Sequence, residues 1–298
     1  MPPNTKNPST VVSETVREQL LECLFQHRAA TTAQLQGMLF PAPHPEYLRE
    51  TLRRLRKADL AESHVRRNHP SIWALTPTGR GLVGKWPQFR DRPSYSFSPR
   101  HARSAHTLVV TRTAMAFIED ARTRQDEARP LDWTPEVAHP LHDGAADGER
   151  MLIADALLRY TRTSPTRALL RAFVEVDRAT ESSERLASKV IAYARFHSNA
   201  PVTGRRTVTD ATGLLAWQRT YPVFPRLLFV LTGAGPRALA HRVADLRAMV
   251  SEHPLTERFV DEVPAGAAVL EEMEESGPSA PVWWPLDGRP GRCSWMEL

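Results

Sequence analysis

The sequence predicts a mixed α/β protein with two folded parts, and three observations support this prediction. Residues 13–58 contain three helical patterns in succession, followed by two short β-prone runs. After residue 103 the predicted order changes to helix, strand, strand, strand, helix and strand. Residues 1–103 hold 16 Lys and Arg but 8 Asp and Glu, whereas the whole chain of 298 residues has a net charge of +5. We therefore expect a basic N-terminal domain and a slightly acidic C-terminal one.

Three helices are predicted in the N-terminal part. Ser13–Arg28 has the periodicity of an amphipathic helix, and Thr32 can cap a second helix over Ala33–Leu39. A third helix is expected over Glu46–Ala58, with Leu48, Leu52 and Leu55 forming its apolar stripe. Its other face carries five basic residues: Arg49, Arg53, Arg54, Arg56 and Lys57.

Two β-prone runs follow the third helix. Leu60–Arg67 and Ser71–Leu75 flank the turn residues Asn68-His-Pro, as in a hairpin. Three helices and a basic hairpin predict a winged helix-turn-helix, in which the third helix enters the major groove of DNA. Arg66 and Arg67 would then be wing contacts to phosphate. The alternative is a protein-interaction module whose basic helix face is merely solvated.

Several other functions are disfavoured by the sequence. Gly79–Lys85 matches the start of a phosphate-binding loop, but Trp86 stands where Ser or Thr must bind Mg²⁺. Cys23 and Cys293 have no partner at metal-binding spacing, so a zinc finger is excluded, and so few cysteines suit a reducing cytoplasm. No apolar run is long enough to cross a membrane. A zinc site at His139, His142 and Asp143 is less consistent with their loop context than solvation is.

The C-terminal part alternates between helical and extended patterns. The weakest of its strand patterns is Asp132–Pro140. A further edge strand is expected over Phe259–Val263. The other predicted elements are a helix over Ser104–Ala121, strands over Met151–Tyr160 and Ala168–Arg178, a helix from Thr180 or Ser182 to His197, a strand over Arg226–Thr232 and a helix over Gly235–Val250.

Three acidic residues interrupt the apolar strand patterns. Glu175 and Asp177 are two residues apart, so on a strand they point to the same face. If the hairpin turns near Pro165, Asp155 on the preceding strand lies opposite or nearly opposite Glu175. Charge in a strand core is unfavourable unless it is paired or binds a metal. Asp155, Glu175 and Asp177 are therefore a candidate Mg²⁺ site.

The order helix, three strands, helix and strand is that of the PD-(D/E)xK nucleases, whose Asp and Glu bind Mg²⁺. That fold normally has a Lys two residues after the Glu, and here this position is Asp177. In one interpretation Lys189 of the following helix reaches back as a relocated lysine, so that Asp155, Glu175, Asp177 and Lys189 are catalytic. In the other, Asp177 pairs with Arg178 or Arg171 and the site is inactive.

The predicted domains are an arm (1–12), a winged helix (13–86), a linker (87–103), a nuclease-like αβββαβ domain (104–263) and an acidic tail containing Trp and Pro (264–298). The tail is either disordered or pinned by its tryptophans.

Three short runs carry a resemblance to a known family. Ile153–Ala156, Phe173–Glu181 and Lys189–Tyr193 resemble the replication-relaxation family of bacterial plasmids and mobile elements. The resemblance covers about residues 13–250 and implies a cytoplasmic, DNA-associated role in plasmid replication, maintenance or transfer. Double-stranded DNA is the expected partner, and a homodimer or contacts with plasmid replication or transfer proteins are compatible with it. Two functions stay open: a Mg²⁺-dependent nickase or endonuclease, and a non-catalytic regulator or replication accessory factor.

Overall fold

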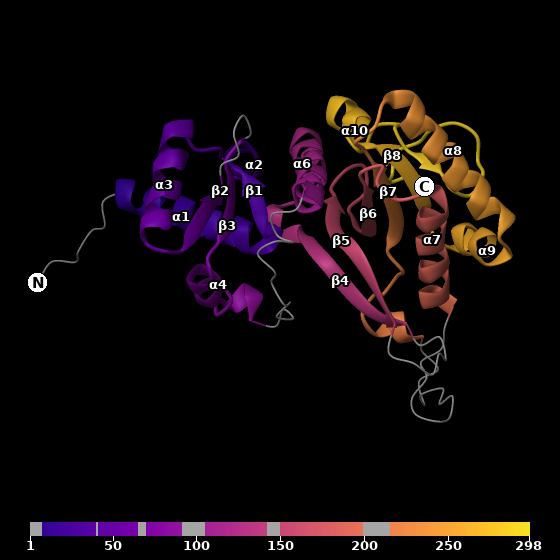
Figure 1. The fold of residues 1–298 in the computed structure, drawn as a ribbon, viewed down its shortest axis with the longest axis horizontal. Coiled ribbons are helices and arrows are strands. Elements are labelled where there is room, and N and C mark those ends of the chain that lie inside the picture. Colours follow the sequence, from indigo (N-terminus) through magenta and orange to yellow (C-terminus); the bar gives the residue numbers. More distant parts are fainter. Residues whose placement is uncertain (1–7, 40, 65–69, 91–104, 142–149, 199–214) are drawn as a thin grey trace, which may run out of the picture. The chain divides into compact units, whose positions relative to one another are not determined.

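The computed structural model describes residues 8–39, 41–64, 70–90, 105–141, 150–198 and 215–298 (Figure 1). It confirms the mixed α/β class, with a three-stranded and a six-stranded sheet. The chain divides into two compact units. Unit 1 consists of Met1–Glu119 and Arg129–Trp133, and unit 2 of Asp120–Ala128 and Thr134–Leu298.

Unit 1 contains helices packed on a small antiparallel sheet of order β1-β3-β2. Ala29 of β1 pairs with Ala74 of β3, and Ala61 of β2 pairs with Leu75. The elements are α1 (Pro8–His27), β1 (Ala29–Thr31), α2 (Thr32–Met38), α3 (Pro45–Lys57), β2 (Ala61–His64), β3 (Ile72–Leu75), α4 (Pro77–Val83), the 3₁₀ turns η1 (Pro87–Phe89) and η2 (Pro130–Asp132), and most of α6 (Ala105–Arg124).

The apolar stripes predicted for unit 1 are buried as expected, but two local features differ from the prediction. Leu48, Leu52 and Leu55 of α3 are at most 1% exposed, so they form the core. Thr31 rather than Thr32 caps α2, because its Oγ1 accepts a hydrogen bond from the Gln34 backbone N–H (3.2 Å). Its own N–H donates to Gln34 Oε1 (2.8 Å). The strand β1, which ends at this cap, had no signal of its own in the sequence.

Helix α6 begins in unit 1 and ends in unit 2. Its Thr111 Oγ1 donates to the carbonyl of Ala29 (3.1 Å), and Gln34 Nε2 donates to the carbonyl of Leu108 (3.1 Å). These two hydrogen bonds attach the first half of α6 to β1 and α2.

Unit 2 is built on the sheet β4-β5-β6-β7-β8-β9. Strands β5 and β6 form an antiparallel hairpin, β6, β7 and β8 are parallel, and β9 closes one edge in the antiparallel direction. The elements are β4 (Trp133–Leu141), β5 (Arg150–Arg162), β6 (Ala168–Asp177), α7 (Ser183–Ser198), η3 (Ala216–Arg219), β7 (Arg226–Leu231), α8 (Pro236–Glu252), α9 (Pro254–Glu262), β8 (Ala265–Val269), α10 (Leu270–Ser276) and β9 (Trp284–Pro285).

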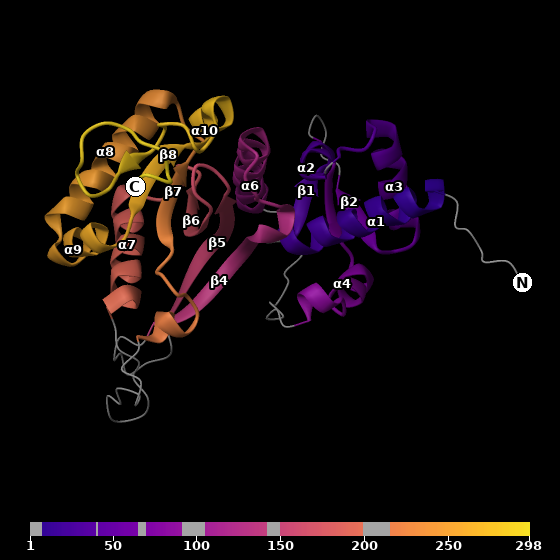
Figure 2. The same cartoon turned by 180° about the vertical axis from the view of Figure 1, so that it is seen from behind.

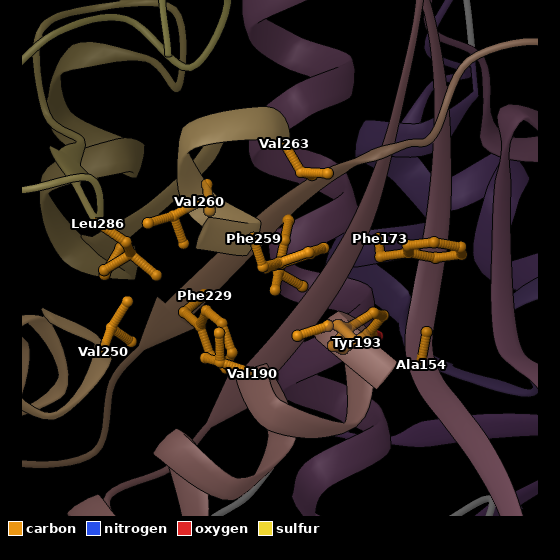
Figure 3. Packing of buried hydrophobic residues seen from close by; sticks show 14 of the residues in the cluster. Ala154, Phe173, Val190, Tyr193, Phe229, Val250, Phe259, Val260, Val263 and Leu286 are labelled. Atoms are coloured by element: carbon orange, nitrogen blue, oxygen red, sulfur yellow. The ribbon is translucent and has the colours of Figure 1, made fainter. Parts of the chain in front are cut away.

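The main core of unit 2 lies between the sheet and a group of three helices. Helices α7, α8 and α9 contact one another and lie together in both ribbon views (Figures 1 and 2). Figure 3 shows Phe173 of β6 beside Tyr193 of α7, with Ala154 of β5 at the same end of the cluster. Phe229 of β7 and Val190 of α7 continue the cluster. The parallel β6–β7 pair is thus covered on this face, as buried parallel strands require.

The predicted edge strand at Phe259–Val263 is wrong. His253 Nδ1 accepts from the Leu255 N–H (3.2 Å) and so caps α9, which runs through Phe259 and Val260 to Glu262. The buried residues Thr256, Phe259 and Val260 have the i, i+3, i+4 spacing of a helix face. A short apolar run does not distinguish a strand from a helix, and here the Pro at the start of the segment was the better signal.

The C-terminal tail is part of the fold. It contributes β8, α10 and β9, and its Trp283, Trp284 and Trp295 are anchored differently. Trp283 and Trp295 are fully buried, and the Trp295 ring packs edge-on against Tyr160 of β5 at 5.2 Å. Trp284 is partly exposed and lies under the guanidinium groups of Arg247 and Arg292. Of the two predicted states of the tail, the structure therefore favours the pinned one.

None of the helices in the described ranges is long and apolar enough to cross a membrane.

We expect Trp295→Ala to lower the free energy of unfolding of unit 2 by about 3–5 kcal/mol, because the substitution leaves a cavity beside Tyr160. Urea denaturation followed by circular dichroism measures this change. Trp284→Ala removes the same side chain from a partly exposed position and should have a clearly smaller effect. Equal stability of wild type and Trp295→Ala would contradict a structural role for the tail.

Candidate functional site

The candidate site lies where β5 and β6 run side by side under α7. Ala156 pairs with Val174 and Leu157 with Phe173, so the register extends Asp155 toward Glu175, as the sequence predicts. The hairpin turn includes the cis bond between Ser164 and Pro165. Asp155 is half-buried, whereas Glu175 is 2% exposed.

Strand β5 is irregular at Asp155. Leu152 and Ala154 belong to the same buried cluster as Leu157, which a strand with strict alternation would not allow. Ile153, between Leu152 and Ala154, is 55% exposed. The Asp155 side chain accepts a hydrogen bond from the Val176 backbone N–H (Oδ2, 2.8 Å), a donor on the neighbouring strand. This hydrogen bond sets the side chain of Asp155 against β6, just before the paired stretch that begins at Ala156.

Both oxygens of Glu175 have partners on α7. The hydroxyl of Tyr193 donates to Oε1 at 2.6 Å, and the ammonium group of Lys189 lies 3.1 Å from Oε2. Lys189 and Tyr193 are four residues apart, so they occupy the same face of the helix on successive turns. Lys189 therefore reaches back to the acidic strand, as the relocated-lysine interpretation predicts, and does not point to solvent. Tyr193 is fully buried and is also part of the site.

Lys189 contacts a second carboxylate that the sequence did not single out. Its Nζ lies 3.2 Å from Oε2 of Glu181, a residue of the turn between β6 and α7. The side chain of Lys189 is 27% exposed. Glu184, the acid in the first turn of α7, is exposed.

Asp177 has a separate partner. Arg242 of α8 donates to its Oδ2 from Nε (3.1 Å) and from Nη2. The Asp177 side chain is buried, and that of Arg242 is 16% exposed. The partner is thus Arg242, and neither Arg178 nor Arg171. Within the described part of the chain, no three His, Cys, Asp or Glu side chains are grouped so that they could hold a metal ion. Asp155 and Glu175 remain together, while Asp177 is held by a guanidinium group.

The charges of the site are strongly coupled. Burial raises the pKa of Glu175 to about 7, and the negative charge of Asp155 adds to this, although Lys189 and Tyr193 oppose it. Burial lowers the pKa of Lys189, but Glu175, Asp155 and Glu181 outweigh burial and raise it above its ordinary value. Burial and the adjacent Glu175 raise the pKa of the Tyr193 hydroxyl. A buried carboxylate can stay ionised when a cation lies beside it, and for Glu175 this cation is the ammonium group of Lys189.

The remaining predicted site residues lie elsewhere. Arg49, Arg53, Arg54, Arg56 and Lys57 are exposed on α3 in unit 1. Arg66 and Arg67, and the proposed zinc ligands His142 and Asp143, lie outside the described residues. His139 is buried against Phe173, Phe196 and Tyr221, and burial lowers its pKa to about 4. Its Nε2 is 3.1 Å from the Tyr221 hydroxyl, so it is a core residue.

Comparison with known families accounts for much of this chain. The family model described as Replication-relaxation matches residues 21–221, about two thirds of the sequence. The chain belongs to the replication-relaxation family. Asp155, Glu175, Asp177, Glu181 and Lys189 all lie within the replication-relaxation match, whereas Arg242 lies beyond its end. No curated protein and no solved structure matches the chain.

Sequence reasoning missed Glu181 and Arg242 for different reasons. Glu181 has a local signal, because it is the first acid after the strand that carries Glu175 and Asp177. Arg242 has none, since 65 residues separate it from Asp177 and its helix has other Arg residues at similar spacing. Its role depends on the parallel β6–β7 pairing, which brings the start of α8 to the end of β6.

We expect Glu175→Gln to change the pH dependence of stability. The pKa of Glu175 rises from an ordinary 4.5 to about 7 on folding, so its protonated form contributes stability that is fully present below pH 4.5 and is lost as the pH rises through 7. The variant lacks this contribution. Its free energy of unfolding relative to wild type should therefore increase by ~1–3 kcal/mol between pH 5 and pH 8.

Urea denaturation at both pH values, with a chelator present, tests this expectation. Glu257→Gln on α9 removes an exposed carboxylate and controls for net charge. A difference between Glu175→Gln and wild type that stays constant over this range would contradict the raised pKa.

Proposed function

We propose that the protein binds duplex DNA through unit 1, acting as a winged helix in the replication or relaxation of a plasmid or mobile element. The order α1, β1, α2, α3, β2, β3 and the sheet order β1-β3-β2 support this assignment, since a winged helix has a hairpin after its third helix. The single observation that carries the proposal is the two-sided character of α3: its leucines are buried and its five basic side chains are exposed.

The acids of α3 do not prevent this role. Arg49 pairs with Glu46 (2.9 Å), and Arg53 and Arg54 pair with Glu50 (3.2 and 3.1 Å), all on the exposed surface. Exposed pairs of this kind contribute at most about 1 kcal/mol each, so a phosphate can replace the acid. Glu46 and Glu50 leave α3 with an excess of three positive charges.

The last turn of α3 offers the strongest phosphate contacts. Arg56 donates a hydrogen bond to Ser63 Oγ of β2 (3.2 Å), which orients its guanidinium group toward the hairpin. Lys57 is exposed beside it. Arg66 and Arg67 follow in the chain and remain predicted wing contacts. Contacts of this type position the protein on DNA without specifying sequence.

We expect binding to duplex DNA to weaken steeply with salt, since the logarithm of the affinity should fall by about 0.9 per phosphate contact for each tenfold increase in salt. The double variant Arg56→Ala and Lys57→Ala should reduce the slope by about 1 for each phosphate-binding side chain that it removes. Fluorescence anisotropy with a labelled duplex measures both. Arg258→Ala with Arg289→Ala removes equal charge from exposed positions of unit 2 and should leave the slope unchanged.

A salt-independent affinity, or no binding to duplex DNA, would favour the alternative of a protein-interaction module.

A second function, Mg²⁺-dependent cleavage of one DNA strand, is favoured by the position of Lys189. The acids Asp155 and Glu175 on adjacent strands, with a lysine at 3.1 Å from Glu175, have the chemistry of the PD-(D/E)xK nuclease site. Magnesium is often bound by one or two carboxylates, with water and substrate phosphate completing its shell, so two acids suffice. Mg²⁺ bound there would polarise the phosphate and promote ionisation of a water molecule.

The residues of the chain have separate parts in such a reaction. Asp155 and Glu175 would bind the cation, and Lys189 would stabilise negative charge on the attacking water or the phosphate. The attacking water would give one proton to solvent and its oxygen would form a bond to phosphorus. The bond from phosphorus to one sugar oxygen would break, and that oxygen would take up a proton from solvent. Asp177 is not assigned to this set, because Arg242 neutralises it. The alternative to a nuclease is a non-catalytic regulator or replication accessory factor. For both functions we propose a cytoplasmic location.

We expect supercoiled plasmid incubated with the protein and Mg²⁺ or Mn²⁺ to be converted to open circles. Asp155→Asn, Glu175→Gln and Lys189→Met should each lower the rate by at least about 100-fold, because each removes a group that acts at the reacting phosphate. Glu257→Gln serves as the matched control. Equal nicking by all variants would indicate a contaminant, and no nicking by wild type with either metal would leave the non-catalytic alternative.

A further inference from the structure

We propose that Glu181 is a positioning residue that holds the ammonium group of Lys189 at the Asp155–Glu175 pair, and that Asp177 and Arg242 fix the turn that carries Glu181. This inference rests on the proposed cleavage function and deepens it, because it names the residues that orient the lysine of that site.

Lys189 has a long side chain with four rotatable bonds, so its position must be fixed by its partners. Two carboxylates do this from different elements. Glu175 on β6 lies 3.1 Å from Nζ, and Glu181 in the β6–α7 turn lies 3.2 Å from it. If Glu175 bound a cation, its oxygens would be shared with the metal. Glu181, which is not assigned to the cation, would then still keep Lys189 beside the site.

The turn that carries Glu181 is fixed at both sides of this residue. The backbone N–H of Glu181 donates to Oδ1 of Asp177 (3.4 Å), and its carbonyl accepts from Nη2 of Arg242 (2.6 Å). Arg242 also donates from Nε to Asp177 (3.1 Å). One guanidinium group thus joins the end of β6 to the residue four positions later, a geometry that Lys could not reproduce.

The backbone of the same turn is held by a close contact. Ala179 has a φ of 56°, in the left-handed region, which lets the chain reverse after β6. Gly233 of the β7–α8 loop packs against it, since a Cβ at Gly233 would be 2.6 Å from the carbonyl oxygen of Arg178. The start of α8 is therefore attached to this turn by backbone packing as well as by Arg242.

This arrangement gives Asp177 a structural task in place of a catalytic one. Asp177 occupies the chain position that the nuclease pattern gives to Lys, and Arg242 takes up its charge. Lys189 forms its ion pairs with Glu175 and Glu181 instead. The two ion-pair systems meet at Glu181, whose backbone belongs to one and whose side chain belongs to the other.

The experiment observes the Lys189 ammonium group directly. The chain has four lysines, Lys6, Lys57, Lys85 and Lys189, so protein labelled with ¹⁵N-lysine gives a simple spectrum. Lys189→Arg assigns the signal. We expect a protected Lys189 ammonium signal in wild type and in Glu184→Gln, which removes an exposed acid from the same helix, and its loss by exchange broadening in Glu181→Gln. An unchanged signal in Glu181→Gln would overturn the proposal.

A second variant tests the turn. Arg242→Lys keeps the charge but cannot hold both Asp177 and the Glu181 carbonyl, so the Lys189 signal should broaden here too. If Glu181→Gln does not fold, Glu181→Asp provides the same test, because the shorter side chain keeps the charge and cannot reach Lys189. Retention of the signal in Arg242→Lys would remove the turn from the proposal.

The plasmid assay supplies the functional arm. Glu181→Gln should lower the nicking rate at saturating DNA by at least about tenfold while the affinity for DNA is unchanged, since a misplaced group affects the reaction and not the binding. If wild type does not nick DNA, the cleavage function fails, yet the lysine spectrum still decides whether Glu181 positions Lys189. Full activity of Glu181→Gln together with a broadened lysine signal would show that the positioning has no part in cleavage, which overturns the inference.

Discussion

The ion pair between Glu175 and Lys189 is the interaction on which the organisation of unit 2 depends. A carboxylate beneath a helix is tolerated only when it has hydrogen-bond partners, and α7 provides two of them, one turn apart. The same helix buries Leu186 and Val190 against the sheet. Apolar packing and charge pairing therefore fix the same helix in the same position. Removal of Lys189 would leave the buried carboxylate of Glu175 with the Tyr193 hydroxyl but without its cation, and breaking a buried ion pair in this way typically destabilises a protein by about 3–5 kcal/mol.

The two ion pairs at the end of β6 differ in their partners and in the exposure of their cations. Asp177 is buried and Arg242 is partly exposed, and both also form hydrogen bonds with the backbone of Glu181 in the neighbouring turn. Lys189 keeps about a quarter of its side chain exposed and lies between acids from two elements. In each pair the carboxylate is buried and the cation is partly exposed, Lys189 more than Arg242. The partners of the two pairs, rather than the sequence order of the acids, are the reason why Asp177 is left out of the proposed site.

Much of this arrangement follows from the sequence. The strands that became β5, β6 and β7 are predicted within a few residues because their apolar runs are long and bounded by turn residues. The approach of Asp155 to Glu175 is also predicted, and the reach of Lys189 is one of the two interpretations that the sequence leaves open. The partner of Asp177 could not be, because no local pattern indicates which distant guanidinium a buried acid will contact.

The irregularity of β5 at Asp155 could not be predicted from the sequence either. A shift of one residue in a strand moves every preceding side chain to the opposite face of the sheet. Likewise, the segment ending at Val263 carries an apolar run that fits a strand or a helix, and only its contacts with the neighbouring helices decide between them.

The close contact between Gly233 and the carbonyl of Arg178 has a wider consequence. It belongs to a part of the sheet that follows residue 221, where the family match ends. A fragment cut at that boundary would retain every acid of the candidate site, yet β6 would become a bare edge and Asp177 would face water without its arginine. A fragment intended for activity measurements should therefore include the C-terminal segment with its tryptophans. It should not end at residue 221, where the family match ends.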